Sequence, residues 1–385
     1  MHYFEFANRD TTIYSGGVTA SINTGMDEIL EVKKEVSNDG SIVNTSRILI
    51  DFDYTYISSS LQTGRIGSDA KFYLNLYDAT SSELEVEQKL FVYMVSGSWL
   101  EGTGKLFDNP VTEKGSSFKY RDTQQETPWV TGSRDNDGGS WYTGSLSGQY
   151  EVSSSHNLTY ESKDLRIDVT DMVNNHIYSS SVYPNNGFIV KRQATGSEGT
   201  GYYYAGDVGS DEGGSGSLGT LKFFSRQTHT IYPPKLEVVW DDSSWSTGSL
   251  NALSSTDLER LKVYFKNIRP EYNEKSVTKF RVVGRELYPS TTFDTTPATL
   301  TIKYLPSASA YYSVRDFETE EEIIPFGTGS KISCDSTGNY FNLNMNGLQA
   351  ERKYRFLIKV VSGSGTLDEQ VNYYDEDDYV FKVVR

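Results

Sequence analysis

Hydrophobic and polar residues alternate along much of the chain. In the first 240 residues the alternating segments lie at 46–54, 70–78, 89–97, 165–173, 187–192, 221–225 and 235–240. Alternation with a period of two residues is typical of a β-strand with one buried face. Apolar residues at helical spacing occur near residue 255 and, less clearly, near residue 169. The pattern therefore predicts an all-β protein with little helix.

A second set of alternating segments follows a polar stretch at 241–255. These segments lie at 261–268, 277–287, 299–305, 310–317, 339–348, 353–361 and 379–385. Seven short strands within about 135 residues suit a β-sandwich of the immunoglobulin or fibronectin type. We predict two antiparallel β-sandwich domains in tandem, at residues 1–240 and 256–385, joined by a linker at 241–255.

Two connections are too long for hairpin turns, residues 102–163 and the glycine-rich residues 195–220. Long loops in compact domains are usually functional or disordered. The second connection contains Tyr202, Tyr203 and Tyr204. Tyrosine buries apolar area and keeps a hydroxyl for hydrogen bonding, so we predict that this triplet contacts a partner. Alternatively, alternate tyrosines face the core of their own domain.

The charge balance restricts the partners. The chain has 36 Lys and Arg against 52 Asp and Glu, a formal net charge of −16. Such a field repels nucleic acids and anionic membrane surfaces. No apolar run approaches the roughly 20 residues that cross a bilayer, and no secretory signal begins the sequence. We therefore expect synthesis in a cytoplasm, no nucleic-acid partner and no membrane insertion.

Residues with catalytic potential are scattered. The one cysteine, Cys334, forms no intrachain disulfide, and the four histidines lack the spacing of a zinc motif. The G-x-S-x-G motif of a hydrolase is missing as well. We predict that the chain is not an enzyme. A glycosidase needs only two carboxylates roughly 5–10 Å apart, so the alternative of a polysaccharide depolymerase stays open.

Trp99 and Glu101 stand side by side where an alternating segment ends. A tryptophan at a strand end can stack on a sugar while a carboxylate accepts hydroxyl hydrogen bonds, and Trp129 and Trp141 could extend such a platform. The alternative is a corner of the sandwich, in which Trp99 fills the core while Gly102 and Gly104 turn the backbone. The glycines favour the corner.

Acidic residues suggest a structural calcium ion. Asp135 and Asp137 precede Gly138 with the spacing that opens a calcium loop, but the twelfth position is Leu146 instead of glutamate. An EF-hand is therefore not predicted. A looser calcium site could use Asp135 and Asp137 or the acidic run at 375–378, and the alternative is a solvated cluster of charges.

One tyrosine has a predicted structural role. Leu348 precedes Tyr354 by six residues, immediately before an alternating segment. This spacing resembles the tyrosine corner of fibronectin-type sandwiches, in which the hydroxyl bonds to nearby backbone. We predict the same for Tyr354.

Several segments together resemble a known family. Six segments, taken in their order along the chain, are similar to the DNRLRE domain, a β-sandwich related to carbohydrate-binding modules. They are SRILIDFD, AKFYLNLYD, VSGSWLEGTG, LRIDVTDMV, GFIVKR and PPKLEVVW. The six-residue motif that names this family is absent. Three further segments resemble structural proteins of tailed-phage virions, namely NTGMDEILEV, NNGFIVKR and LKFFSRQTHTIYPPKLEVVWDD. The C-terminal segment from residue 312 to residue 360 resembles such proteins as well.

The resemblance implies a function in assembly. It implies a non-enzymatic virion component, associated with the tail, neck or baseplate, that forms a homo-oligomer within a symmetric assembly and contacts other virion proteins. Its localisation would be the virion. The alternatives are a module that binds host surface glycan and the depolymerase. Glycan binding predicts exposed, coplanar aromatic rings, whereas assembly predicts apolar surface that a partner covers.

Overall fold

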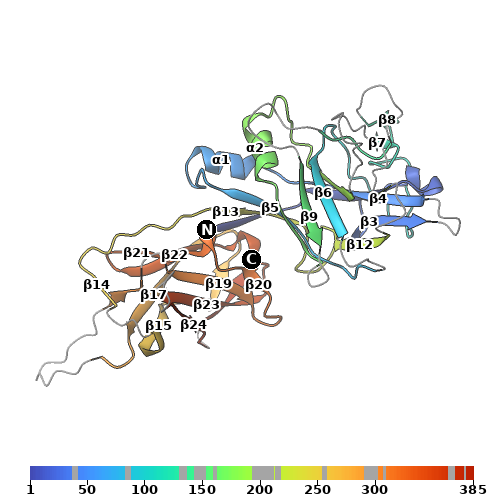
Figure 1. Cartoon of the computed structure of the whole chain (residues 1–385). Helices are drawn as coiled ribbons and strands as arrows, with labels where there is room; N and C mark the ends of the chain where they lie inside the picture. Colours follow the sequence, from blue (N-terminus) through green and yellow to red (C-terminus); the bar gives the residue numbers. More distant parts are fainter. Residues whose placement is uncertain are drawn as a thin grey trace, which may run out of the picture. The chain divides into compact units, whose positions relative to one another are not determined.

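The computed structural model describes residues 1–36, 42–82, 88–129, 137–142, 153–158, 163–192, 212, 218–253, 258–289, 302–306, 309–362, 369–376 and 379–385 (Figure 1). β-Strands dominate this part of the chain, and its α-helices are α1 (Thr55–Gln62) and α2 (Thr170–Tyr178). The prediction of an all-β protein is confirmed.

The described chain groups into two compact units. The N-terminal unit consists of Glu5–Ser59 and Lys71–Glu237, and the C-terminal unit consists of Met1–Phe4, Ser60–Ala70 and Val238–Arg385. The predicted domain and linker limits stay predictions. The last change of unit along the chain, after Glu237, nevertheless lies close to the predicted limit at residue 240.

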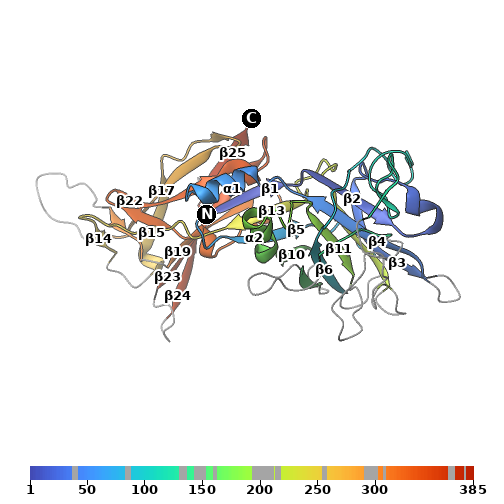
Figure 2. The same cartoon turned by 90° about the horizontal axis from the view of Figure 1, so that it is seen from above.

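A seven-stranded sheet and a four-stranded sheet come from the first 240 residues. The larger sheet has the order β12-β3-β4-β11-β6-β9, with β2 also paired to β4, and the smaller has the order β1-β13-β5-β10 (Figure 2). The strand bounds are β1 His2–Phe6, β2 Arg9–Tyr14, β3 Ile29–Val36, β4 Ile42–Asp51, β5 Lys71–Leu76, β6 Gln88–Met94, β9 Ser153–Leu158, β10 Leu165–Asp168, β11 Phe188–Arg192, β12 Gly219–Phe224 and β13 Lys235–Val239. A hairpin of β7 (Tyr120–Asp122) and β8 (Thr127–Pro128) lies in the long connection.

Strand β4 is the centre of the larger sheet. Its alternation explains its burial, because Ile48 and Ile50 face one side of the sheet while Arg47 and Leu49 face the other. Each of these side chains is completely buried. The strand therefore has neighbours on both faces, and one of those faces buries a charge.

Two predicted elements differ from the observed ones. The segment predicted as a strand at 165–173 leaves the sheet after Asp168, and α2 begins at Thr170. The Asp168 carboxylate accepts the Thr170 N–H at 2.9 Å, which satisfies one of the free donors at a helix start. Of the segment with helical spacing near 255, the described residues form a 3-10 turn at Leu258–Arg260 and then the strand β15, which pairs with β17.

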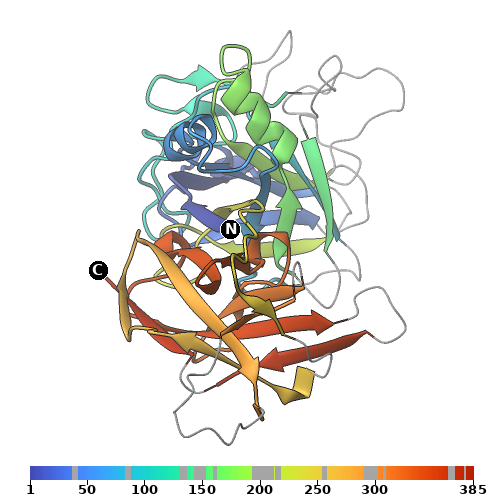
Figure 3. The same cartoon turned by 90° about the vertical axis from the view of Figure 1, so that its left-hand side faces the viewer.

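The C-terminal unit contains two six-stranded sheets, drawn in yellow to red in Figure 3. One has the order β14-β18-β17-β22-β21 with β15 on β17, and the other has the order β16-β25-β23-β19-β20 with β24 on β23. The bounds are β14 Asn251–Ala252, β15 Leu261–Lys266, β16 Glu271–Asn273, β17 Val277–Glu286, β18 Lys303–Tyr304, β19 Ala310–Asp316, β20 Glu322–Ile324, β21 Ser333–Asp335, β22 Gly338–Asn344, β23 Lys353–Ser362, β24 Gln370–Tyr374 and β25 Val380–Val384. The short pairs β14–β18 and β16–β25 are parallel, and the other described pairs of this unit are antiparallel.

Tyr354 forms the predicted corner. Its hydroxyl accepts the Gln349 N–H at 2.7 Å and lies 3.2 Å from the Gln349 carbonyl, to which it donates. The ring is buried in the aromatic core of the C-terminal unit. The prediction that Tyr354 is structural is confirmed.

Candidate functional site

The three tryptophans of the alternative sugar-platform interpretation lie together in a core. Trp99 and Trp129 are each 1% exposed and Trp141 is 7% exposed. They pack in one cluster with Leu49 and Ile189 of the large sheet. Stacking on a sugar requires an open ring face, so the burial of Trp99, Trp129 and Trp141 argues against the alternative of a sugar platform. It agrees with the favoured interpretation, in which Trp99 fills the core.

Trp99 is held by polar contacts on its rim and on its face. Its indole N–H donates to the Asn186 carbonyl at 2.8 Å. The Arg9 guanidinium lies over the ring, 4.5 Å from the centroid, and also donates to the Trp99 carbonyl. Arg9 in turn pairs with Asp51 at 2.9 Å. These contacts occupy the ring face that a sugar would need.

Glu101 is part of an internal ion pair. Both of its carboxylate oxygens lie 2.9 Å from an Arg226 guanidinium nitrogen, and one oxygen accepts the Asp10 N–H at 3.1 Å. The Arg226 N–H donates to the Asp10 carboxylate at 2.7 Å. Burial raises the pKa of Asp10 to about 7. Arg226 thus connects two carboxylates that the sequence separates by 91 positions.

The corner prediction for Gly102 and Gly104 agrees with the backbone. Asn23 is completely buried, and its side-chain amide donates to the carbonyls of Glu101 and Ser116 at 2.6 and 2.9 Å. Gly102 has φ +83°, and a Cβ there would clash with the Asn23 side-chain oxygen. Only glycine allows both this conformation and this approach. The segment around Trp99 and Glu101 is therefore a packed turn.

The large sheet also buries an ion triad that the sequence reading missed. The Glu212 carboxylate lies 2.7 Å from the Arg47 guanidinium and 3.0 Å from the Lys191 ammonium, and all three side chains are at most 1% exposed. Both cations also lie over the Trp141 ring, at 5.3 and 4.7 Å. Burial raises the pKa of Glu212, but the attraction of Arg47 and Lys191 outweighs it and leaves that pKa below its usual value.

The other predicted site residues are only partly described. Tyr202, Tyr203, Tyr204 and Asp135 lie outside the described residues, whereas Asp137 lies within them. Within the ranges described above, no group of three or more acidic, histidine or cysteine side chains has metal-binding geometry. Asp375 and Glu376 of the acidic run pair with Arg355 and Lys262. The calcium hypothesis therefore stays a prediction.

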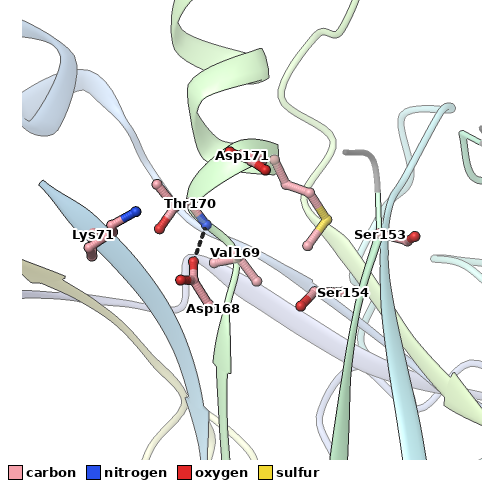
Figure 4. Close-up of a pocket in the computed structure, with 8 residues that line it drawn as sticks. Lys71, Ser153, Ser154, Asp168, Val169, Thr170 and Asp171 are labelled. Carbon is pink, nitrogen blue, oxygen red and sulfur yellow. Dashed lines mark hydrogen bonds between the residues drawn. The ribbon is translucent and has the colours of Figure 1, made fainter. Parts of the chain in front are cut away.

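A polar cavity of about 200 Å³ lies at the edge of the N-terminal sandwich, where β9 of one sheet packs beside β10 of the other. Its lining is Lys71, Ser153, Ser154, Asp168, Val169, Thr170, Asp171 and Met172. In Figure 4, Lys71 lies on one side, Ser153 and Ser154 on the other, and Asp171 at the start of α2. The sequence pattern does not indicate this cavity, because Ser153 and Ser154 lie in a connection without alternation and the other lining residues lie in two segments predicted as strands.

The start of α2 gives this cavity its shape. The Val169 N–H donates to the Phe72 carbonyl at 2.9 Å, and the Phe72 N–H donates to the Thr170 hydroxyl at 3.0 Å. Together with the contact between Asp168 and Thr170, these bonds join the end of β10 to the beginning of β5. The polar side chains of the cavity are therefore presented by a fixed backbone.

Comparison with known proteins adds little. No family model matches the chain, and no curated protein matches it. A similar solved structure is that of a DUF4785 family protein from Legionella pneumophila subsp. pneumophila str. Philadelphia 1, with 10% identity and a TM-score of 0.20 over 97% of this chain and 68% of that chain. A likeness at that TM-score carries no argument. The helices among the described residues lack the length and apolar character of a membrane span.

Proposed function

We propose that the chain is a non-enzymatic structural component of a tailed-phage virion, associated with the tail, neck or baseplate, that works through protein–protein contacts. The virion assignment rests on the sequence resemblance described above. The proposed mode of action rests on one observation about the N-terminal unit. Its tryptophans are enclosed, whereas several other large apolar side chains are open to solvent.

We define four of those open side chains as the apolar loop end. Its members, with their exposed fractions, are Val18 at 87%, Met26 at 37%, Leu100 at 49% and Phe107 at 88%. Their segments are joined by backbone hydrogen bonds, from Met26 to Gly104 at 2.9 Å and from Asn23 to Val111 at 2.8 Å. Removal of apolar surface from water is favourable by roughly 25 cal/mol per Å². Covering this loop end in an assembly would therefore stabilise a contact.

The residues around Trp99 and Glu101 give less support to the two alternative functions, glycan binding and polysaccharide cleavage. A glycan-binding strip needs exposed aromatic rings, and Trp99, Trp129 and Trp141 are buried. A glycosidase needs two carboxylates that face the substrate. Asp10 is 1% exposed, and Glu101 is neutralised by Arg226. Assembly is therefore the function that these side chains favour.

The mode of action can be tested by sedimentation velocity on the full chain. Val18→Ser combined with Phe107→Ser should weaken self-association or binding to co-produced virion proteins by roughly tenfold or more. Both side chains are exposed, so the melting temperature should stay within about 3 °C of the wild type. The matched control is Tyr178→Ser with Val182→Ser, which removes two side chains exposed by 62% and 60% on the same unit and should leave association unchanged.

Two further measurements decide between the functions. Mass spectrometry of purified phage particles should detect the chain among the virion proteins, and its absence from particles would overturn the virion assignment. A glycan array should give no signal that depends on Trp99. Strong glycan binding by a chain that stays monomeric would favour the carbohydrate-binding module instead.

A further inference from the structure

We infer that Asp10, Glu101 and Arg226 form a proton-dependent latch on the turn at residues 100–106, which is closed while Asp10 is protonated and opens once Asp10 ionises. The latch lies within the N-terminal unit and does not depend on the proposed assembly role. Its consequence for assembly rests on the proposed function, because Leu100 of this turn belongs to the apolar loop end.

Three segments meet at the latch. Asp10 lies on β2, Glu101 lies in the turn, and Arg226 follows the end of β12. Both Glu101 carboxylate oxygens lie 2.9 Å from an Arg226 guanidinium nitrogen. The Asp10 carboxyl accepts the Arg226 backbone N–H at 2.7 Å, and the Asp10 N–H donates to the Glu101 carboxylate at 3.1 Å. These contacts connect the turn to two strands of the large sheet.

The latch contains two carboxyl groups and one guanidinium. Asp10 is 1% exposed, and its Oδ1 atom is enclosed without a hydrogen-bond partner among the described residues. The Glu101 side chain is 19% exposed and holds the guanidinium. Two neighbouring carboxyl groups with one cation do not both ionise easily when one of them is buried. Asp10 therefore retains a proton to higher pH, and burial with the nearby Glu101 charge raises the pKa of Asp10 to about 7.

A third carboxyl group contacts the same turn. Asp27 accepts the Leu106 N–H at 3.1 Å, and burial raises the pKa of Asp27 to about 6. The neighbouring Met26 N–H donates to the Gly104 carbonyl at 2.9 Å. A raised pKa means that the closed state favours the protonated form. Ionisation of Asp27 therefore acts in the same direction as ionisation of Asp10.

The charges around the latch leave this imbalance in place. Three neighbouring cations are each paired with another acid, namely Lys105 with Glu28 at 3.6 Å, Lys222 with Glu31 at 3.9 Å, and Arg9, on the opposite face of β2, with Asp51 at 2.9 Å. The further titratable groups near Asp27 are Tyr14 and Asp108. The contact with Arg226 is therefore the main compensation for an ionised Asp10.

Water provides the remaining stabilisation, and it reaches Asp10 only when a covering segment moves. The turn at residues 100–106 carries the Glu101 carboxylate, which repels an ionised Asp10, so we expect this turn to open. A carboxyl group in contact with water titrates near pH 4. The closed turn is therefore most stable below pH 4 and loses stability as the pH rises to about 7, the pKa of Asp10 in the closed state.

The test is hydrogen exchange of the full chain by mass spectrometry at pH 5 and pH 7.5, corrected for the intrinsic exchange rates. Peptides that contain Met26 and Gly104 report on the turn, because these N–H groups bond to the Gly104 carbonyl and to the Asn23 side chain. Their protection should fall by roughly tenfold or more between the two pH values. Peptides from β4 should keep their protection, because the opening is local.

Two variants remove the ionisation. Asp10→Asn keeps an acceptor for the Arg226 N–H, and most of the fall in protection should disappear. The double variant Asp10→Asn with Asp27→Asn should remove nearly all of it. The matched control is Asp171→Asn, at an exposed aspartate of the same unit, which should behave like the wild type. The inference is overturned if Asp10→Asn loses protection with pH as the wild type does, or if peptides from β4 lose protection in parallel, which would indicate global unfolding.

Sedimentation velocity tests the consequence for assembly. Asp10→Asn should self-associate like the wild type at pH 5 and roughly threefold or more tightly than the wild type at pH 7.5, because the variant keeps the binding-competent turn closed. Equal association of both chains at pH 7.5 would contradict the link between the latch and assembly. Absence of self-association at either pH would contradict the proposed function, whereas the exchange experiment decides on the latch independently.

Discussion

Asp10 is a carboxyl group placed where a carboxylate is costly. It is 1% exposed, and burial raises its pKa to about 7, while the hydrogen bond from the Arg226 N–H lowers that pKa in part. A raised pKa means that the folded state favours the protonated form. The stability linked to Asp10 is therefore present below pH 4 and is lost as the pH rises towards 7.

Asp10→Asn should reverse this loss. The amide keeps an acceptor for the Arg226 N–H and carries no charge, so the variant should gain about 2–4 kcal/mol over the wild type between pH 4 and pH 8. Urea unfolding at both pH values measures the difference. Asp108→Asn, at an exposed position, serves as the control and should show no such trend. If the difference in the free energy of unfolding between Asp10→Asn and the wild type is the same at pH 4 and pH 8, the raised pKa of Asp10 is contradicted.

The sequence pattern indicates which charged residues of the large sheet stand at core positions. In SRILID, Arg47 is in phase with Leu49, and in FIVKR, Lys191 is in phase with Ile189. A charge at a position that alternation assigns to the core predicts either an exposed face or a buried partner. The partner, Glu212, lies in a glycine-rich connection without alternation. Spacing alone therefore could not identify it.

At the scale of the element, Glu212 connects β4 and β11 through its ion pairs with Arg47 and Lys191. Glu212→Gln keeps the size of the side chain but removes the negative charge that pairs with two buried cations. We expect a loss of about 3–5 kcal/mol in the free energy of unfolding. Glu28→Gln, which breaks an exposed pair with Lys105 at 3.6 Å, should cost less than about 1 kcal/mol. Guanidinium unfolding compares the two variants, and equal costs would refute the burial argument.

The tyrosine corner ties the turn before β23 to the core of the C-terminal unit. Tyr354→Phe removes the acceptor of the Gln349 N–H, so we expect a loss of about 1–3 kcal/mol in the free energy of unfolding. Tyr373→Phe, at a ring that is 53% exposed, should change it by less than about 0.5 kcal/mol. Thermal and urea unfolding of both variants measure the effect. If Tyr354→Phe leaves the free energy of unfolding unchanged, water replaces the hydroxyl at no cost in stability, which contradicts the prediction.

For the whole molecule, the formal net charge of −16 affects how strongly copies of the chain associate. Like-charged subunits repel, and salt screens this repulsion over a Debye length of about 10 Å at 0.1 M. If the apolar loop end drives association, sedimentation velocity should show stronger self-association as NaCl rises from roughly 0.05 to 0.5 M. Association that weakens with salt would point to contacts made by opposite charges.

Sequence patterns predicted the regular strands well and the irregular ones poorly. Alternation identified β4, β5, β6, β11 and β13. In each of these strands, either every second side chain is buried or nearly all side chains are buried. Strand β9 reads SSSHNL and has no such pattern, so only its pairing with β6 makes it a strand. The segment after Asp168 alternates like a strand, but it forms the helix α2 from Thr170 onward.

The sequence by itself determined the all-β class, the position of the tyrosine corner and the turn at Gly102, because alternation, a fixed spacing and glycine's freedom at positive φ are local properties. Only the tertiary structure decided that three tryptophans fill a core, that Arg226 joins Asp10 to Glu101, and that Lys71 shares a cavity with Asp168 and Asp171. These groups come from distant segments, and sheet pairing brings them together.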